Sequence, residues 1–385
     1  MQKIRYDIIF VALILLLTLL GLVTLYSASF LFASNQPLRF RSGWTPITSN
    51  LIVCGIMLIL FPTLALMKLD WLKNGAAIIA IVIAAIILNS IPIILSYARS
   101  SEGSHVRRWI LINVGSHAFS FQPSEIIKVV LPLYLAYILD KNSEKLNSFA
   151  YGFLPPVILT VIFGALVLCQ SNFSETVLIL IISTLICFAA GVRLLWFSCS
   201  LALIPVFYVL ITSDRDGRWY KRFMGFFSKE IDPSGRDYQI LSSMEAVQSG
   251  GFWGKGIGQG TLKTRMPEVH GDFVLASYAE ETGLLGILIY LILIGFFVYF
   301  GYSTAWKSRD KFRQVLAFGL TTAIAVQTLT NIAVVVKLIP TTGIPLPFVS
   351  SGGSSLLITL IASALLVNIA RWNILSGETG GHGAR

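Results

Sequence analysis

The feature that most constrains this chain is a series of apolar runs, several of which approach or exceed the roughly 20 residues that a helix needs to cross a bilayer. Strands of a membrane barrel would alternate apolar and polar residues over about 10 positions, and these runs do not alternate. Hydrophobic residues make up 55% of the 385-residue chain and charged residues only 12%, which is far from the balance of a soluble domain. The sequence therefore predicts an all-α, polytopic integral membrane bundle.

We expect about ten transmembrane helices in a single membrane domain of residues 1–376, followed by a disordered cytoplasmic tail at 377–385. The first run follows two basic residues, but its length exceeds the ~7–15-residue apolar region of a signal peptide, so it is predicted to be a retained span. The predicted spans are 8–32, 49–67, 75–95, 123–140, 151–170, 174–192, 195–212, 274–302, 314–338 and 353–371.

Lysine and arginine are unevenly divided between the two sets of short loops. The positive-inside rule assigns the richer set, which includes both termini, to the cytoplasm. The formal net charge of +10 is thus a topology signal, and no nucleic-acid partner is expected. Residues 213–273 then form a large extracytoplasmic loop, whose stretch 250–260 contains too many glycines for any regular element.

Three ionisable residues crowd the outer edge of the eighth predicted span: Glu268, His270 and Asp272. In a chain so poor in charge, such groups beside lipid are costly to hold, which makes this stretch a functional candidate. Two plainer interpretations stay open. Asp272 could cap the helix that begins near Phe273, and His270 could be a structural hydrogen-bonding residue.

A second polar cluster precedes and opens the fourth predicted span. Its members are Arg107, Arg108, Trp109, Gln122, Ser124, Glu125 and Lys128. Glu125 and Lys128 share a helix face, so they could form a buried ion pair that fixes helix packing. Alternatively, Lys128 and the two arginines could hold a phosphate-bearing headgroup.

Two further segments lie on the same predicted side. Residues 170–175 are typical of a tight turn with capping residues rather than of a site. Residues 340–355 hold three prolines and three glycines at membrane depth, and such backbone is tolerated only where protein or a water-filled cavity surrounds it. A polar cavity on the outer face is therefore expected.

Five other residues complete the set that we expect to bind or support a substrate. Ser350, Gly352 and Gly353 belong to the irregular segment, and Lys255 belongs to the glycine-rich stretch. Glu281 lies inside the eighth span, where it could form a buried proton relay with its neighbour Glu280.

The motifs match one known family in content and order. They are Arg107-Arg108-Trp109, Phe121-Gln122-Pro123-Ser124-Glu125, Pro267-Glu268-x-His270-x-Asp272-Phe273, and the run from Pro340 to Ser354. With these motifs the chain resembles the shape, elongation, division and sporulation (SEDS) family, typified by RodA and FtsW, over about residues 6–372. The segment 256–260 favours the FtsW branch.

The resemblance implies a peptidoglycan glycosyltransferase of the bacterial cytoplasmic (inner) membrane. Such an enzyme polymerises lipid II at the outer face, together with a class B penicillin-binding protein transpeptidase and other divisome or elongasome membrane proteins. The family's essential aspartate corresponds to Asp272, and its loop tryptophan corresponds to Trp109. Asp272 is then the expected base for the attacking hydroxyl, with Glu268, Glu125 or Glu281 as helpers.

A glycosyl transfer from a lipid diphosphate also needs cations for the departing group. Arg107, Arg108, Lys128 or a divalent metal ion such as Mg²⁺ or Mn²⁺ could supply them. No organic cofactor is expected.

The chain departs from the family pattern at four positions. Asn172 stands where aspartate is usual, Ser351 where tyrosine is common, Lys337 where glycine is usual and Gly271 where threonine is usual. Two alternatives to a polymerase therefore stay open. One is a flippase for the same lipid-linked precursor, which intramembrane charges and broken helices would suit, and the other is a non-catalytic scaffold that activates the transpeptidase.

Overall fold

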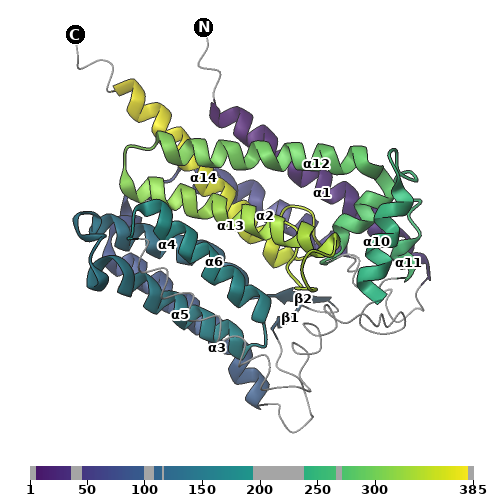
Figure 1. The fold of residues 1–385 in the computed structure, drawn as a ribbon, viewed down its shortest axis with the longest axis horizontal. Coiled ribbons are helices and arrows are strands. Elements are labelled where there is room, and N and C mark those ends of the chain that lie inside the picture. The colour runs from purple at the N-terminus through teal and green to yellow at the C-terminus, as the bar shows by residue number, and fades with distance from the viewer. Residues whose placement is uncertain are drawn as a thin grey trace.

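The computed structural model of the protein describes residues 6–35, 46–98, 108–114, 117–193, 238–265 and 271–379. These residues form a bundle of long helices with one short hairpin, as Figure 1 shows, so the predicted all-α membrane class is confirmed. The long helices are α1 (Tyr6–Asn35), α2 (Pro46–Leu66), α3 (Gly75–Ala98), α4 (Ser124–Lys141), α5 (Leu154–Cys169), α6 (Phe173–Ala190), α10 (Tyr238–Gly250), α12 (Val274–Lys307), α13 (Lys311–Val335) and α14 (Gly353–Thr379).

Eight of the described helices are long and apolar enough to cross a membrane. They coincide with eight of the ten predicted spans. The predicted span 123–140 is helical as α4, although four charged residues keep it out of that group of eight. The predicted span 195–212 lies outside the described residues, as does loop segment 213–237. At the other end of the chain α14 continues to Thr379, three residues into the predicted tail, whose remainder lies outside the described residues.

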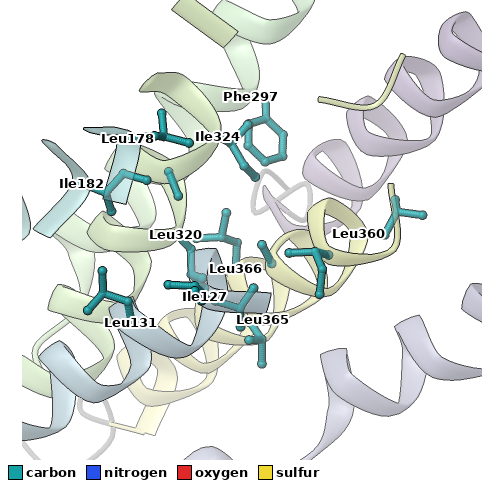
Figure 2. Close-up of a cluster of buried hydrophobic side chains, with 14 of the residues drawn as sticks. Ile127, Leu131, Leu178, Ile182, Phe297, Leu320, Ile324, Leu360, Leu365 and Leu366 are labelled. Carbon is teal, nitrogen blue, oxygen red and sulfur yellow. The ribbon is translucent and has the colours of Figure 1, made fainter. Parts of the chain in front are cut away.

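Helix α13 occupies the middle of the bundle, where it packs against α4, α6, α12 and α14. Figure 2 shows the apolar side chains that these helices bring together, including Ile127, Leu131, Leu178, Ile182, Phe297, Leu320, Ile324, Leu360, Leu365 and Leu366. Lipid tails are as apolar as leucine, so close packing rather than escape from water holds such helices together. At Gly301 the two helices α12 and α13 approach so closely that a Cβ there would overlap the Thr321 side chain.

A short antiparallel hairpin precedes α4, and the sequence did not predict it. Strands β1 (Ile110–Val114) and β2 (His117–Phe121) pair with Ile110 opposite Phe121. The hairpin returns the chain so that residues 108 and 109 lie next to the start of α4. It therefore brings the arginine-tryptophan motif to the helix that carries Glu125 and Lys128.

Helix α12 is broken at Gly283, whose φ of +66° and ψ of −164° are not helical. The glycine-rich segment docks on this break. The backbone N–H groups of Lys255 and Gly256 donate to the carbonyls of Glu280 and Glu281, at 3.0 Å each. Gly254 has a φ of +80°, and a Cβ there would overlap the Glu281 carbonyl oxygen. Glycine is needed at 254 because only a residue without a side chain fits both the conformation and the contact.

Candidate functional site

Asp272 lies two residues before the start of α12. That end of α12 is away from the start of α1 and the end of α14 (Figure 1). The N-cap residue of the helix is Phe273, so Asp272 does not occupy the capping position that the sequence allowed. Glu268 and His270, the other members of the predicted acidic stretch, lie outside the described residues.

Hydrogen bonds from neutral side chains hold the backbone around Asp272. Asn331 on α13 donates from Nδ2 to the Asp272 carbonyl at 2.9 Å and to the Ile344 carbonyl at 2.8 Å. Ser350 donates from Oγ to the Gly271 carbonyl at 2.7 Å and accepts from the Leu346 N–H at 2.7 Å. The structure therefore brings predicted residue Ser350 to the stretch that carries Asp272.

The irregular segment predicted between the last two spans is confirmed, since residues 340–352 are not helical. Gly343 has a φ of +74°, and a Cβ built on it would lie 3.5 Å from Oδ2 of Asp272. The Asp272 side chain thus lies against this segment. Lys337 has a φ of +58°, in the left-handed region that glycine adopts most readily.

A buried ion cluster lies at the same end of the bundle. Lys128 Nζ is 2.7 Å from Glu125 Oε2, 3.5 Å from Glu175 Oε1 and 2.8 Å from Gln327 Oε1. Gln327 Oε1 accepts a hydrogen bond from this ammonium, and the two carboxylates are its charge partners. Lys128 is 5% exposed. The structure favours the packing interpretation of the Glu125–Lys128 pair over the phosphate-binding one.

Glu175 enters this cluster from the first turn of α6. The N-cap residue of α6 is Asn172, and its side chain makes no capping hydrogen bond. The expected tight turn is present, with a φ of +55° at Ser171. Glu175, three residues after Asn172, thus contributes a carboxylate that contacts Lys128.

The ion cluster and Asp272 are both attached to the irregular segment. Gln327 receives a hydrogen bond from Lys128 and donates from Nε2 to the Pro345 carbonyl at 2.7 Å. Gln327 and Asn331 are four residues apart and therefore share one face of α13. That face links the buried charges to the segment beside Asp272.

The remaining residues of the second predicted cluster surround the start of α4. Gln122 donates to Ser124 Oγ at 2.9 Å, and its backbone N–H donates to Ser354 Oγ at 3.4 Å. Ser354 follows Gly352 and Gly353, so these two predicted residues lie at the junction of α4 and α14. The Arg108 guanidinium donates to the Ser171 carbonyl.

Two members of that motif remain. Trp109 is 41% exposed, and Arg107 lies outside the described residues.

Lys255 and Glu281 belong to a different group of contacts. Lys255 pairs with Glu280 at 2.7 Å, and Glu281 pairs with the buried Lys263 and accepts a hydrogen bond from Ser27 at 2.6 Å. Glu281 lies about 12 Å along the helix from its start beside Asp272. Both carboxylates are engaged in ion pairs, Glu280 with the glycine-rich segment and Glu281 with Lys263. The roles of Glu281 as a helper of Asp272 and as a proton relay with Glu280 stay predictions.

Sequence reasoning missed Glu175, Gln327 and Asn331. A usable signal was present for the last two, because polar amides four residues apart in an apolar span mark one polar helix face. Glu175 belongs to the 170–175 turn, where the sequence favours capping residues over a site.

No group of three or more His, Cys, Asp and Glu side chains that could hold a metal ion occurs among the residues that the structure describes. Glu125 and Glu175 already share Lys128, so the described residues offer no fitting ligand set for Mg²⁺ or Mn²⁺. The divalent-metal expectation stays a prediction.

These features define a class of protein, namely a multi-pass helical membrane protein that holds buried charges and a stretch of non-helical backbone close to Asp272 at one end of the bundle. A family model for cell cycle proteins, covering FtsW, RodA and SpoVE, matches residues 7–374. The chain belongs to this family.

Individual relatives match the chain over nearly its full length. A probable peptidoglycan glycosyltransferase FtsW of Geobacter sulfurreducens is 32% identical over 372 residues, which cover 95% of each chain. Stage V sporulation protein E of Bacillus subtilis is 32% identical over 379 residues, which cover 97% of this chain and 99% of that protein.

Two solved structures share the fold. One is a chain from a peptidoglycan synthase complex described in terms of polymerization and crosslinking, with a TM-score of 0.73 and 23% identity over 96% of this chain and 99% of that chain. The other is the rod shape determining protein RodA of Thermus thermophilus, with a TM-score of 0.62 and 21% identity over 96% of this chain and 98% of that chain.

Proposed function

We propose that this protein is a peptidoglycan glycosyltransferase that polymerises lipid II into glycan strands. Its family and its relatives named as such enzymes, at 32% identity over 95% of the chain, support the activity. The structural observation that carries the proposal is the placement of Asp272 at the edge of α12, against the irregular segment 340–352 and held there by Asn331 and Ser350.

Asp272 acts as the general base in this proposal. Its carboxylate takes the proton from the acceptor hydroxyl, whose oxygen forms a bond to the anomeric carbon of the donor sugar. The bond from that carbon to the diphosphate oxygen breaks, and the lipid diphosphate leaves with the electron pair. A single displacement of this kind inverts the anomeric configuration.

The arginines of the 107–109 motif are proposed to bind the departing diphosphate. A guanidinium matches phosphate oxygens in a bidentate way, and the Arg108 side chain contacts the 171 turn next to the ion cluster. Lys128 is no longer proposed for this role, because its ammonium is engaged with Glu125, Glu175 and Gln327. Exposed Trp109 suits contact with the substrate or with lipid headgroups.

A class B penicillin-binding protein transpeptidase is the proposed partner, with other divisome or elongasome proteins around it. The solved synthase complex, whose description joins polymerization to crosslinking, supports this. The proposed sidedness, with cytoplasmic termini and an extracytoplasmic site, rests on the positive-inside rule. Relatives named FtsW support a role in division, and midcell rather than sidewall localisation of a fluorescent fusion would test it.

Purified protein in vesicles with labelled lipid II, with and without the transpeptidase, tests the activity. Glycan polymer is the expected product. Translocation of lipid II without polymer would instead indicate a flippase, and neither product would indicate a scaffold. A parallel assay with EDTA and with added Mg²⁺ or Mn²⁺ tests the divalent-metal expectation.

A further inference from the structure

Asn331 joins two segments of the chain that are far apart in sequence. Its Nδ2 donates to the carbonyl of Asp272, 59 residues before it, and to the carbonyl of Ile344, 13 residues after it. Asn331 is 1% exposed. A single buried nitrogen therefore sets the separation between the chain at Asp272 and the irregular segment.

Gln327, one turn earlier on α13, extends this arrangement. It donates to the carbonyl of Pro345, the residue after Ile344. Consecutive carbonyls of the irregular segment are thus held by two amides on one helix face. Gln327 is itself held by Lys128, so the face is anchored to the buried ion cluster rather than to solvent.

The consequence falls on the Asp272 carboxylate. Gly343 directly precedes Ile344, and a Cβ at Gly343 would lie 3.5 Å from Oδ2 of Asp272. When the carbonyls of Asp272 and Ile344 are fixed to the same nitrogen, the carboxylate is fixed relative to Gly343 as well. A displacement of about 1 Å in such a group can lower a rate by about 10²-fold.

We infer that Asn331 is a positioning residue for Asp272. It acts through the Asp272 and Ile344 carbonyls, keeps the carboxylate at a set distance from the irregular segment and does not itself contact the reacting atoms. This inference rests on the proposed glycosyltransferase activity, and it assigns to α13 the role of aligning the base.

The test compares three variants in the lipid II polymerisation assay. Asn331→Leu removes both N–H donors and keeps the branched shape of the side chain, and Asn331→Ser retains one donor. Thr330→Ala is the matched control, because among the described residues the Thr330 hydroxyl bonds only to the Val326 carbonyl within α13. We expect kcat to fall by roughly 10- to 100-fold for Asn331→Leu and by less for Asn331→Ser, with KM within about threefold of wild type and Thr330→Ala unchanged.

A double variant distinguishes alignment of Asp272 from general damage. If Asn331 acts through Asp272, then Asn331→Leu combined with Asp272→Asn is no slower than Asp272→Asn alone, because residues that act as a unit are not additive. Additive losses, or an Asn331→Leu or Asn331→Ser protein with wild-type kcat, would overturn the inference. Should Asn331→Leu not fold, Asn331→Ser supplies the same comparison. Failure of the wild-type protein to polymerise would instead count against the proposed function.

Discussion

Asp272 and the pair Glu280–Glu281 lie on the same stretch of chain, about two helical turns apart, yet their surroundings differ. Glu280 accepts from Lys255 Nζ and from the backbone N–H groups of residues 261 and 262, and Glu281 pairs with Lys263. The backbone of Asp272 is held by a neutral amide instead, from Asn331.

The difference teaches that an acidic residue near a membrane edge is not by itself a sign of catalysis. A buried carboxylate must be paired, and the partners of Glu280 and Glu281 all belong to segments that need to be fastened to α12. Glu280 and Glu281 therefore have a structural role in the fold. The Asp272 main chain is held by the neutral amide of Asn331 on α13, which fixes the position of the residue.

The largest expected effect is on the rate, from Asp272→Asn. Loss of a general base is expected to lower kcat by about 10²- to 10⁴-fold, while the midpoint of thermal unfolding in detergent stays near that of wild type. The measurement is polymer formed per folded molecule from labelled lipid II. An Asp272→Asn protein that polymerises at the wild-type rate would remove Asp272 from the mechanism.

Glu281→Gln should produce the opposite profile. It leaves the Lys263 ammonium buried with one charge partner fewer, which costs about 3–5 kcal/mol of stability. The rate per folded molecule should not change. Unfolding midpoints and polymer yields measured on the same preparations check both parts, and Glu281→Gln combined with Lys263→Met should recover part of the loss. If Glu281→Gln instead lowered kcat and left the stability unchanged, Glu281 would behave like Asp272 and the prediction would be wrong.

Two glycines sharpen the same contrast, since both have positive φ. Gly254→Ala would overlap the Glu281 carbonyl and should cost more than about 2 kcal/mol of stability with little change in rate. Gly343→Ala meets Asp272 Oδ2 only at an ordinary contact distance, so it should cost about 1–2 kcal/mol but lower kcat by roughly 10-fold. If the two variants lost stability and kcat to the same extent, the surroundings of Asp272 and of Glu281 would not differ as proposed.

Glu175→Gln should have the smallest effect. Two carboxylates share Lys128, and the weaker contact is the 3.5 Å one to Glu175. Neutralising Glu175 removes repulsion from Glu125 and a costly desolvation, so stability should stay within about 1 kcal/mol of wild type. The measurement is the midpoint of thermal unfolding of Glu175→Gln compared with that of Glu125→Gln. The Glu125→Gln variant removes the 2.7 Å contact to Lys128 and should be strongly destabilised. A large loss for Glu175→Gln would mean that Lys128 needs both partners.

Much of the fold could be predicted from local sequence. Apolar runs identified the helices because spanning length and hydropathy are properties of consecutive residues, and the predicted start at 274 is the observed start of α12. The glycine-rich stretch and the prolines from 340 onward correctly indicated irregular backbone. The hairpin at 110–121 was missed, because two five-residue strands carry little signal in a chain that is apolar almost throughout.

The sequence by itself determined the membrane bundle, the position of Asp272 at a helix edge and the polar segments that surround it. Apart from the local Glu125–Lys128 pair, only the tertiary structure decided which charges pair. Lys128 meets Glu175 across α4 and α6, Lys263 meets Ser27 across 236 residues, and Asn331 reaches Asp272 across 59. The physical reason is that a buried polar group must find a partner among whichever helices pack beside it, and that adjacency is set by the packing of whole helices rather than by spacing along the chain.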